Sequence, residues 1–409
     1  MNLDQSIISS NKGINRESFS IFALYILVYG GYIKLFFPIV STVVIGLQVA
    51  VMILSILLDN KVVIGNKKSV IVLSIMLISI VLMCLGFFYT SDVEIARNRL
   101  TIDLSTILYI IIIYIIASRL DVEKLNSLIQ KFMRYNIILI SLYFVLYIGI
   151  FISGLSVGGR LGDVVGNAIW LGRLCSEQIM LILISNNWKL SRVQKLLFIL
   201  LSAICVFTGS KGPIVVVFVV LTLYFIKITS LSPKKIAITI MISLALLAVF
   251  YAISNASSTF IVNRFSLGTM MASGSGYRVS RYTYTIQAIP EHLVMGHGLG
   301  SWSKNYWASY GVTSSFNDYP HNILLELLYE NGIVVTFIWL LSVFLVWRAF
   351  KIVSRERIYV LWLLLIMNVL FGFFSGSIID GNRGIYYFFA ICVALIPKLK
   401  KYDLLKEKV

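Results

Sequence analysis

Residues 290–336, PEHLVMGHGLGSWSKNYWASYGVTSSFNDYPHNILLELLYENGIVVT, contain all three histidines of the chain: His292, His297 and His321. This stretch closes the one long polar segment of a chain that is otherwise apolar enough to lie in lipid. Its last part predicts the start of a helix, with Asp318 as the capping residue and Pro320 in the first turn. His321 would then lie in that first turn, where free backbone N–H groups favour an anion and a neutral imidazole.

The rest of the chain has the composition of a membrane protein. Of its 409 residues, 59% are hydrophobic and only 13% are charged, and its mean hydropathy is +0.90. Soluble globular proteins carry about 25% charged residues. Because about 20 apolar residues cross a bilayer as a helix, we predict an all-α polytopic bundle of about twelve transmembrane helices. The predicted spans lie near residues 19–36, 38–58, 69–89, 100–118, 132–153, 168–186, 195–209, 213–228, 236–254, 332–350, 358–377 and 384–397.

The basic residues predict how these spans are oriented. With the N-terminus in the cytoplasm, roughly two thirds of the 35 Lys and Arg residues fall in cytoplasmic segments, as the positive-inside rule requires. The net charge of +17 therefore predicts membrane orientation and no nucleic-acid partner. The chain divides into spans one to nine (1–254), a long outer loop (255–331), and spans ten to twelve with a cytoplasmic tail (332–409). That loop is too long for a simple connection and is predicted to be a helical, catalytic subdomain.

Two motifs of the opening stretch carry a family resemblance. They are GHGLGSW at 296–302 and PHNILLELLYENGIV at 320–334, which join a glycine-rich turn, a His-Asn pair, a Glu and a Gly that opens the next span. The combination is similar to the C-terminal signature of the O-antigen polymerase and O-antigen ligase superfamily. The resemblance implies a GT-C-like enzyme of the bacterial inner membrane that transfers lipid-linked glycans on the periplasmic or outer side.

The resemblance also implies site residues before the sixth span. The superfamily shows an Arg followed by a Gly-Asn there, which Arg160 and Asn167 match. Arg173 is a further candidate for contact with the substrate. Its alternative is a structural ion pair with Glu177, four residues later on the same helix.

Further cations lie in the turn after the seventh span and in the long loop. The turn TGSKGP, residues 208–213, has Lys211 where related proteins often have Arg; its alternative is a lysine that reaches the head groups from a helix end. Arg278 matches an Arg that begins an amphipathic helix in the superfamily, and Arg281 lies one turn later on the same face. Arg264, earlier in the loop, is a further candidate for contact with the substrate. The alternative for the two arginines of the helix is binding to anionic lipid head groups.

These residues predict one chemistry. An undecaprenyl pyrophosphate is already a good leaving group, so the enzyme needs positive charge on the diphosphate and a base for the acceptor hydroxyl. Lys211, Arg278 and Arg281 would supply the charge, with Arg160 as a further candidate, and His321 would take the proton. Asn322 or Glu326 would fix the end of the helix. No acidic cluster with metal-ligand spacing is present in the outer segments, so we predict inverting transfer without a metal or another cofactor.

Two alternatives to a polymerase of surface polysaccharide remain open. A polymerase would transfer the growing glycan to the non-reducing end of a lipid-linked repeat unit, whereas a ligase would transfer it to lipid A core. The alternative of another class is a transporter or flippase for the same lipid-linked glycan, which would need polar groups along a path through the spans. The predicted partners are the lipid-linked oligosaccharide as donor and acceptor, membrane lipids, and a protein that regulates chain length.

Overall fold

The computed structural model describes residues 4–57, 66–120, 122–152, 167–186, 189–208, 210–228, 276–312, 318–350, 359–377 and 383–406. Throughout these residues the regular structure is helical, and no strand occurs among them. The α-helices before the long loop are α1 (Asp4–Phe36), α2 (Ser41–Leu57), α3 (Lys67–Leu85), α4 (Val93–Arg119), α5 (Val122–Ile152), α6 (Ala168–Ser185), α7 (Arg192–Phe207) and α8 (Lys211–Ile228). Those from the loop onward are α12 (Gly276–Ala288), α13 (Ser301–Ala308), α14 (Ile323–Phe350), α15 (Tyr359–Ser375) and α16 (Arg383–Lys406).

The predicted spans agree with these helices. Every predicted span within the described residues coincides with a helix, and the span at 236–254 lies outside them. By length and composition, seven segments of the described chain are able to cross a membrane: Ser18–Phe36, Pro38–Leu57, Lys67–Tyr89, Val93–Arg119, Ser127–Leu146, Ala168–Ser185 and Ile323–Phe350. The protein is therefore an all-helical, polytopic membrane protein, while the total of twelve spans stays a prediction.

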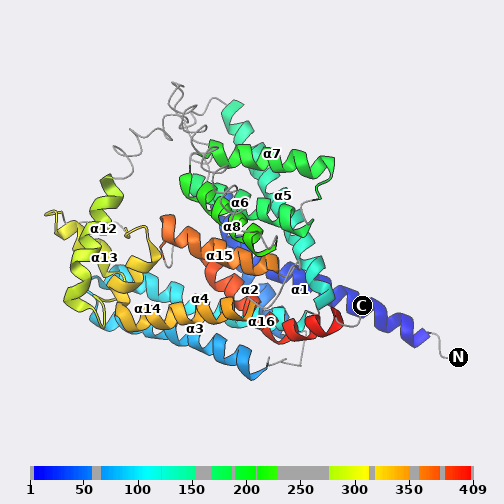
Figure 1. The fold of residues 1–409 in the computed structure, drawn as a ribbon, viewed down its shortest axis with the longest axis horizontal. Helices are drawn as coiled ribbons and strands as arrows, with labels where there is room; N and C mark the ends of the chain where they lie inside the picture. Colours follow the sequence, from blue (N-terminus) through cyan, green and yellow to red (C-terminus); the bar gives the residue numbers. More distant parts are fainter. Residues whose placement is uncertain are drawn as a thin grey trace.

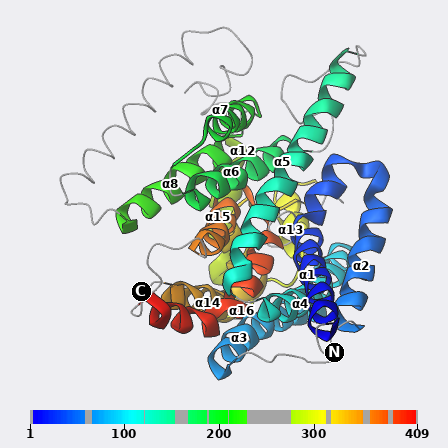
Figure 2. The ribbon, with the colours of Figure 1, turned by 90° about the vertical axis from the view of Figure 1, so that its right-hand side faces the viewer.

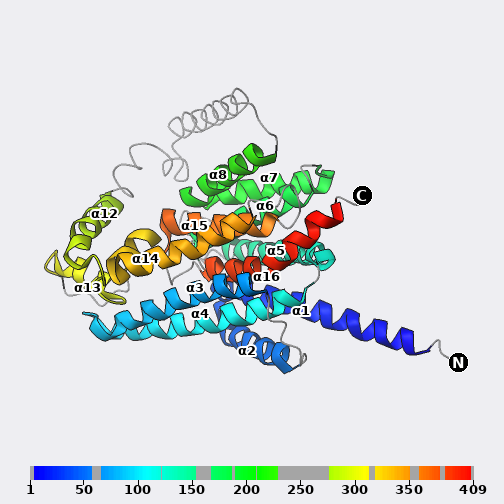
Figure 3. The same cartoon turned by 60° about the horizontal axis from the view of Figure 1, so that its bottom comes forward.

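The helices pack as two groups joined by α1 and α15 (Figure 2). In one group α6 packs against α5, α7 and α8, and in the other α16 packs against α3, α4 and α14. Helix α15 contacts both groups through α6, α8, α14 and α16. The short helices α12 and α13 form a lobe at one end of the bundle, and both chain termini lie at the other end (Figures 1 and 3). The lobe and the termini thus lie at opposite ends of the bundle, and which end faces outward stays a prediction.

Helix α14 is broken at Gly332, and the glycine-rich turn fills the break. Gly332 has φ 71° and ψ −179°, which removes the regular helical bonding around it. The turn replaces the lost bonds: His297 N donates to the carbonyl of Tyr329 (2.8 Å), Gly298 N donates to that of Glu330 (3.0 Å), and Ile333 N donates to that of Leu293 (2.8 Å). A Cβ atom at Gly332 would overlap the main chain of Val294. The GHGLG sequence is thus part of the helix break.

A buried ion cluster holds the short arm of α14, residues 323–331, against α4. The same atom of Arg99, Nη1, lies 2.7 Å from Glu326 Oε1 and 2.8 Å from Glu330 Oε2. The arginine is 2% exposed and both glutamates are fully buried. The two glutamates lie one helical turn apart, so both face the same guanidinium. Ser377, just after α15, donates a further hydrogen bond to Glu326 at 2.8 Å.

Replacing Arg99 by Met should destabilise the protein by about 3–5 kcal/mol, because two buried carboxylates would lose their common cation. The matched control is Arg97→Met, two residues earlier on α4, where the side chain is exposed and the change should stay within about 0.5 kcal/mol. Unfolding in mixed detergent micelles, followed by circular dichroism, measures both. Equal stability of the two variants would contradict a structural role for the cluster.

Candidate functional site

The last turns of α15 bring together side chains that are far apart in sequence. Three donate to main-chain oxygens there: Arg173 to Phe371 (3.5 Å), Asn322 to Phe373 (3.2 Å) and Arg278 to Phe374 (3.1 Å). The carbonyls at a helix C-terminus lack intrahelical partners and carry partial negative charge, so they attract such donors. Three of the predicted site residues therefore meet at one helix end. The sequence FGFFSGS of residues 371–377 gave no sign of this role, because it reads as the end of an apolar span.

The start of α14 differs from the prediction. The helix begins at Ile323, and the side chain of Asn322 caps it by accepting from the N–H groups of Leu324 (3.0 Å) and Leu325 (3.2 Å). Asp318 is therefore not the capping residue, and His321 precedes the helix rather than lying in its first turn. With φ 59°, His321 is the one described residue other than glycine that has a positive φ. That conformation turns the chain so that Asn322 can cap.

His321 lies among aromatic and cationic groups. Its ring centroid is 4.4 Å from that of Tyr319, and the hydroxyl of Tyr282 points to its main-chain oxygen at 3.5 Å. Burial, followed by the charges of Arg281 and Arg278, lowers the pKa of His321 to about 4. The imidazole is therefore neutral at physiological pH, as predicted, but the causes are burial and the arginines rather than the helix dipole. The neutral imidazole is the form that accepts a proton, and the two nearby cations make it a weaker base than an unperturbed histidine.

Asp318 forms an ion pair with Arg281 instead of capping α14. The Nη2 atom of Arg281 lies 2.6 Å from Asp318 Oδ2, and its guanidinium is 6.0 Å from the ring centre of Tyr306. This pair ties α12 to the segment that precedes His321. Arg278 and Arg281 both lie close enough to His321 to affect its charge, so they share one side of α12, as their spacing predicts. One of them is anchored by a carboxylate and the other by a main-chain oxygen.

The ion pair between Arg173 and Glu177, the alternative to substrate contact by Arg173, is not formed. Glu177 Oε1 accepts instead from Asn368 Nδ2 at 2.9 Å and from the Tyr32 hydroxyl at 3.5 Å. The guanidinium of Arg173 lies over the rings of Trp170 and Phe371, at 5.1 and 5.3 Å. A spacing of four residues on a helix allows this pair, but Glu177 accepts hydrogen bonds from Tyr32 on α1 and Asn368 on α15 instead.

The remaining predicted residues lie in different surroundings. Asn167 caps α6 by accepting from Ile169 N at 2.9 Å. Lys211 is the first residue of α8, and the turn before it packs on α6, where Gly172 leaves room for Thr208 and Pro213. Arg160 and Arg264 lie outside the described residues.

Two further predictions concern Glu326 and the histidines of the glycine-rich turn. Glu326 is fully buried and contacts Arg99 and Ser377, so its carboxylate holds the start of α14 in place, and its predicted contact with the substrate stays a prediction. His297 stacks on Tyr329 with ring centroids 4.2 Å apart, and His292 lies 4.5 Å from His297. These two histidines therefore pack on each other and on Tyr329 at the glycine-rich turn. Arg99 was missed as a structural residue, although a charged residue in a predominantly apolar helix was the signal for it.

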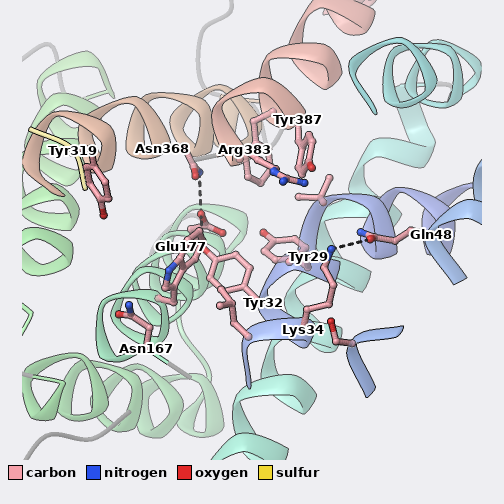
Figure 4. Close-up of a pocket in the computed structure, with 17 residues that line it drawn as sticks. Tyr29, Tyr32, Lys34, Gln48, Asn167, Glu177, Tyr319, Asn368, Arg383 and Tyr387 are labelled. Carbon is pink, nitrogen blue, oxygen red and sulfur yellow. Dashed lines mark hydrogen bonds between the residues drawn. The ribbon is translucent and has the colours of Figure 1, made fainter. Parts of the chain in front are cut away.

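A cavity of about 550 Å³ lies between α1, α2, α6, α15 and α16, next to the segment that precedes His321 (Figure 4). Asn167 and Trp170 line it from α6, and Tyr319 lines it from the segment before His321. Because the ring of Tyr319 also contacts that of His321, the cavity adjoins the predicted base. In size it falls among small-molecule sites, which occupy about 300–1,000 Å³. Sequence reasoning missed the contributions of α1 and α16, since their residues are distant from every motif.

A comparison with known protein families matches part of the chain. No curated protein matches the chain. Among the described residues no group of three or more His, Cys, Asp or Glu side chains is arranged to hold a metal ion. Residues 196–340, which include Lys211, Arg278 and His321, match the family model Wzy_C, described as O-antigen ligase. Over that segment the match confirms the resemblance to the O-antigen polymerase and ligase superfamily, which acts in O-antigen assembly.

Proposed function

We propose that the protein is a polymerase of surface polysaccharide, which transfers a glycan from undecaprenyl pyrophosphate to the non-reducing end of a lipid-linked repeat unit. The observation that carries the proposal is His321, a neutral imidazole beside Arg278 and Arg281 whose ring contacts Tyr319, a residue of the cavity lining. A base and cations in one place are what transfer from a diphosphate to a hydroxyl requires. We place this site on the periplasmic or outer face of the inner membrane.

The proposed reaction balances without a cofactor. The oxygen of the acceptor hydroxyl forms a bond to the anomeric carbon of the donor, and the bond from that carbon to the diphosphate oxygen breaks. The diphosphate leaves with the bonding electron pair, and His321 receives the proton of the hydroxyl. Attack from the face opposite the leaving group inverts the anomeric centre. Arg278 and Arg281, the two cations beside His321, stabilise the negative charge that develops on the diphosphate.

The second candidate is a ligase that transfers the glycan to lipid A core, and the description of the matched family favours it. The two activities share the donor, the base and the cations, and they differ in the acceptor. A single assay separates them: purified protein is incubated with a lipid-linked repeat unit, with and without lipid A core. A ladder of products without core supports the polymerase, whereas one product that depends on core would replace our proposal by the ligase.

Replacing His321 by Ala should lower transferase activity by about 10²–10⁴-fold, the range for loss of a general base. The matched controls are His292→Ala and Arg97→Ala, which lie in the turn and on the exposed face of α4. The measurement is the length distribution of the glycan in cells that lack the native gene and express each variant at equal membrane levels. Full-length glycan from the His321→Ala cells would remove His321 as the base.

The low pKa of His321 sets the acid limit of activity. Because its pKa is about 4, the His321 imidazole stays neutral between pH 7 and pH 5. The enzyme should lose activity only as the pH falls through 4 and the imidazole becomes protonated. In Arg281→Gln one of the charges that lower this pKa is removed, so the acid limb of kcat/KM should move upward, toward the ordinary value of about 6.5. The profile is recorded where circular dichroism shows folded protein, with His292→Ala as control. An acid limb that does not move would exclude His321 as the titrating group.

A further inference from the structure

The cavity beside Tyr319 presents two cations on one wall (Figure 4). Lys34 lies in the last turn of α1, and Arg383 is the first residue of α16. Lys34 Nζ donates to Gln48 Oε1 at 3.3 Å, and the two cations are close enough for their charges to interact. Within the described residues no carboxylate lies within 4.0 Å of either cation. This wall therefore carries positive charge that the described part of the protein does not pair.

The opposite wall presents a buried carboxylate. Glu177 is 1% exposed, and its Oε1 atom accepts from Asn368 at 2.9 Å. Its Oε2 atom has no hydrogen-bond partner in the described part of the chain. A buried acceptor without a partner costs free energy, so a hydroxyl donor in the cavity would be favourable there. Figure 4 shows Glu177 and Asn368 together on the side of the cavity away from Gln48.

Aromatic rings complete the lining. Trp170 and Tyr32 pack edge to face, with ring centroids 5.3 Å apart, and Tyr319 and Tyr387 line other parts of the cavity. Amphipathic rings contact the apolar C–H faces of a sugar, while amides and carboxylates bind its hydroxyls. Paired cations bind a carboxylate or a phosphate. The whole set fits a sugar that carries a negatively charged substituent.

We propose that this cavity binds a sugar residue with an anionic substituent, a carboxylate or a phosphate, at the acceptor end of the glycan. The assignment to the acceptor rests on the proposed function, because Tyr319 brings the cavity next to His321. Lys34 and Arg383 bind the anionic substituent, and Glu177 accepts a hydrogen bond from a ring hydroxyl. A sugar held in this way would present another hydroxyl toward the base.

Binding without turnover tests the site itself. Full-length protein in nanodiscs of phosphatidylcholine is titrated with methyl glucuronide, with glucose 6-phosphate and with neutral methyl glucoside, followed by saturation-transfer NMR. The charged sugars should bind at least about tenfold more tightly than the neutral one, since charge-assisted hydrogen bonds are roughly twice as strong as neutral ones. The preference between the two charged sugars identifies the substituent as carboxylate or phosphate.

Variants locate the binding. Arg383→Gln and Lys34→Gln should each weaken the binding of the charged sugar by about tenfold and leave the neutral sugar unchanged. Lys304→Gln is the matched control, because Lys304 is exposed on α13 and donates to the Ser91 main chain, away from the residues of the cavity. Equal binding of charged and neutral sugars, or no loss in the two variants, would overturn the proposal. Displacement by farnesyl diphosphate but by no charged sugar would also overturn it, since the cavity would then hold the donor.

The acceptor assignment has its own readout. In the polymerase assay Arg383→Gln should raise the KM for the acceptor about tenfold while kcat changes little, because the residue binds and does not react. A drop in kcat at unchanged KM would contradict binding of the acceptor at this position. If the protein proves not to be a polymerase, the binding experiment still stands, so the two proposals fail separately.

Discussion

The contact of Arg99 with Glu326 and Glu330 is the constraint on which the rest of the site depends. A guanidinium and two carboxylates buried in an apolar bundle are stable only while they stay together, since each alone would be an unpaired buried charge. The glutamates lie four residues apart, so the arginine fixes both the position and the rotation of the short arm of α14. The start of that arm is Asn322, which therefore has a fixed place to cap the helix and to reach the end of α15.

The break in α14 makes such an arm possible. Main-chain groups that leave a helix within an apolar bundle need partners from the protein, because lipid supplies none. The glycine-rich turn supplies them through His297 and Gly298. Gly332 and the turn must be free of side chains at the contact, since a Cβ atom on either side would meet the main chain of the other. The two motifs that carry the family resemblance are therefore one structural unit, although they are separated in sequence.

The sequence predicts the helices well, because a long apolar run in a membrane protein has one favourable structure. It predicts less of the site, because local rules there compete with contacts between distant segments. Asp318 has the chemistry of a helix cap but pairs with Arg281, and Asn322 takes its place. Glu177 has the right spacing from Arg173 but bonds to α15. The sequence of α15 gives no indication that donors gather at its end, because their acceptors are main-chain carbonyls, which every residue has.

The same arginines have two effects on His321 in the proposed reaction. In the free protein their charges help to keep the imidazole neutral, which is the form that accepts a proton. A diphosphate bound to these cations would offset their charge, and the pKa of His321 would then rise toward its ordinary value. The base would thus become stronger when the donor is in place, at the point where the acceptor hydroxyl must lose its proton. The anchors of Arg278 and Arg281 on Phe374 and Asp318 hold the two cations in position before any ligand arrives, so this coupling needs no rearrangement of the bundle.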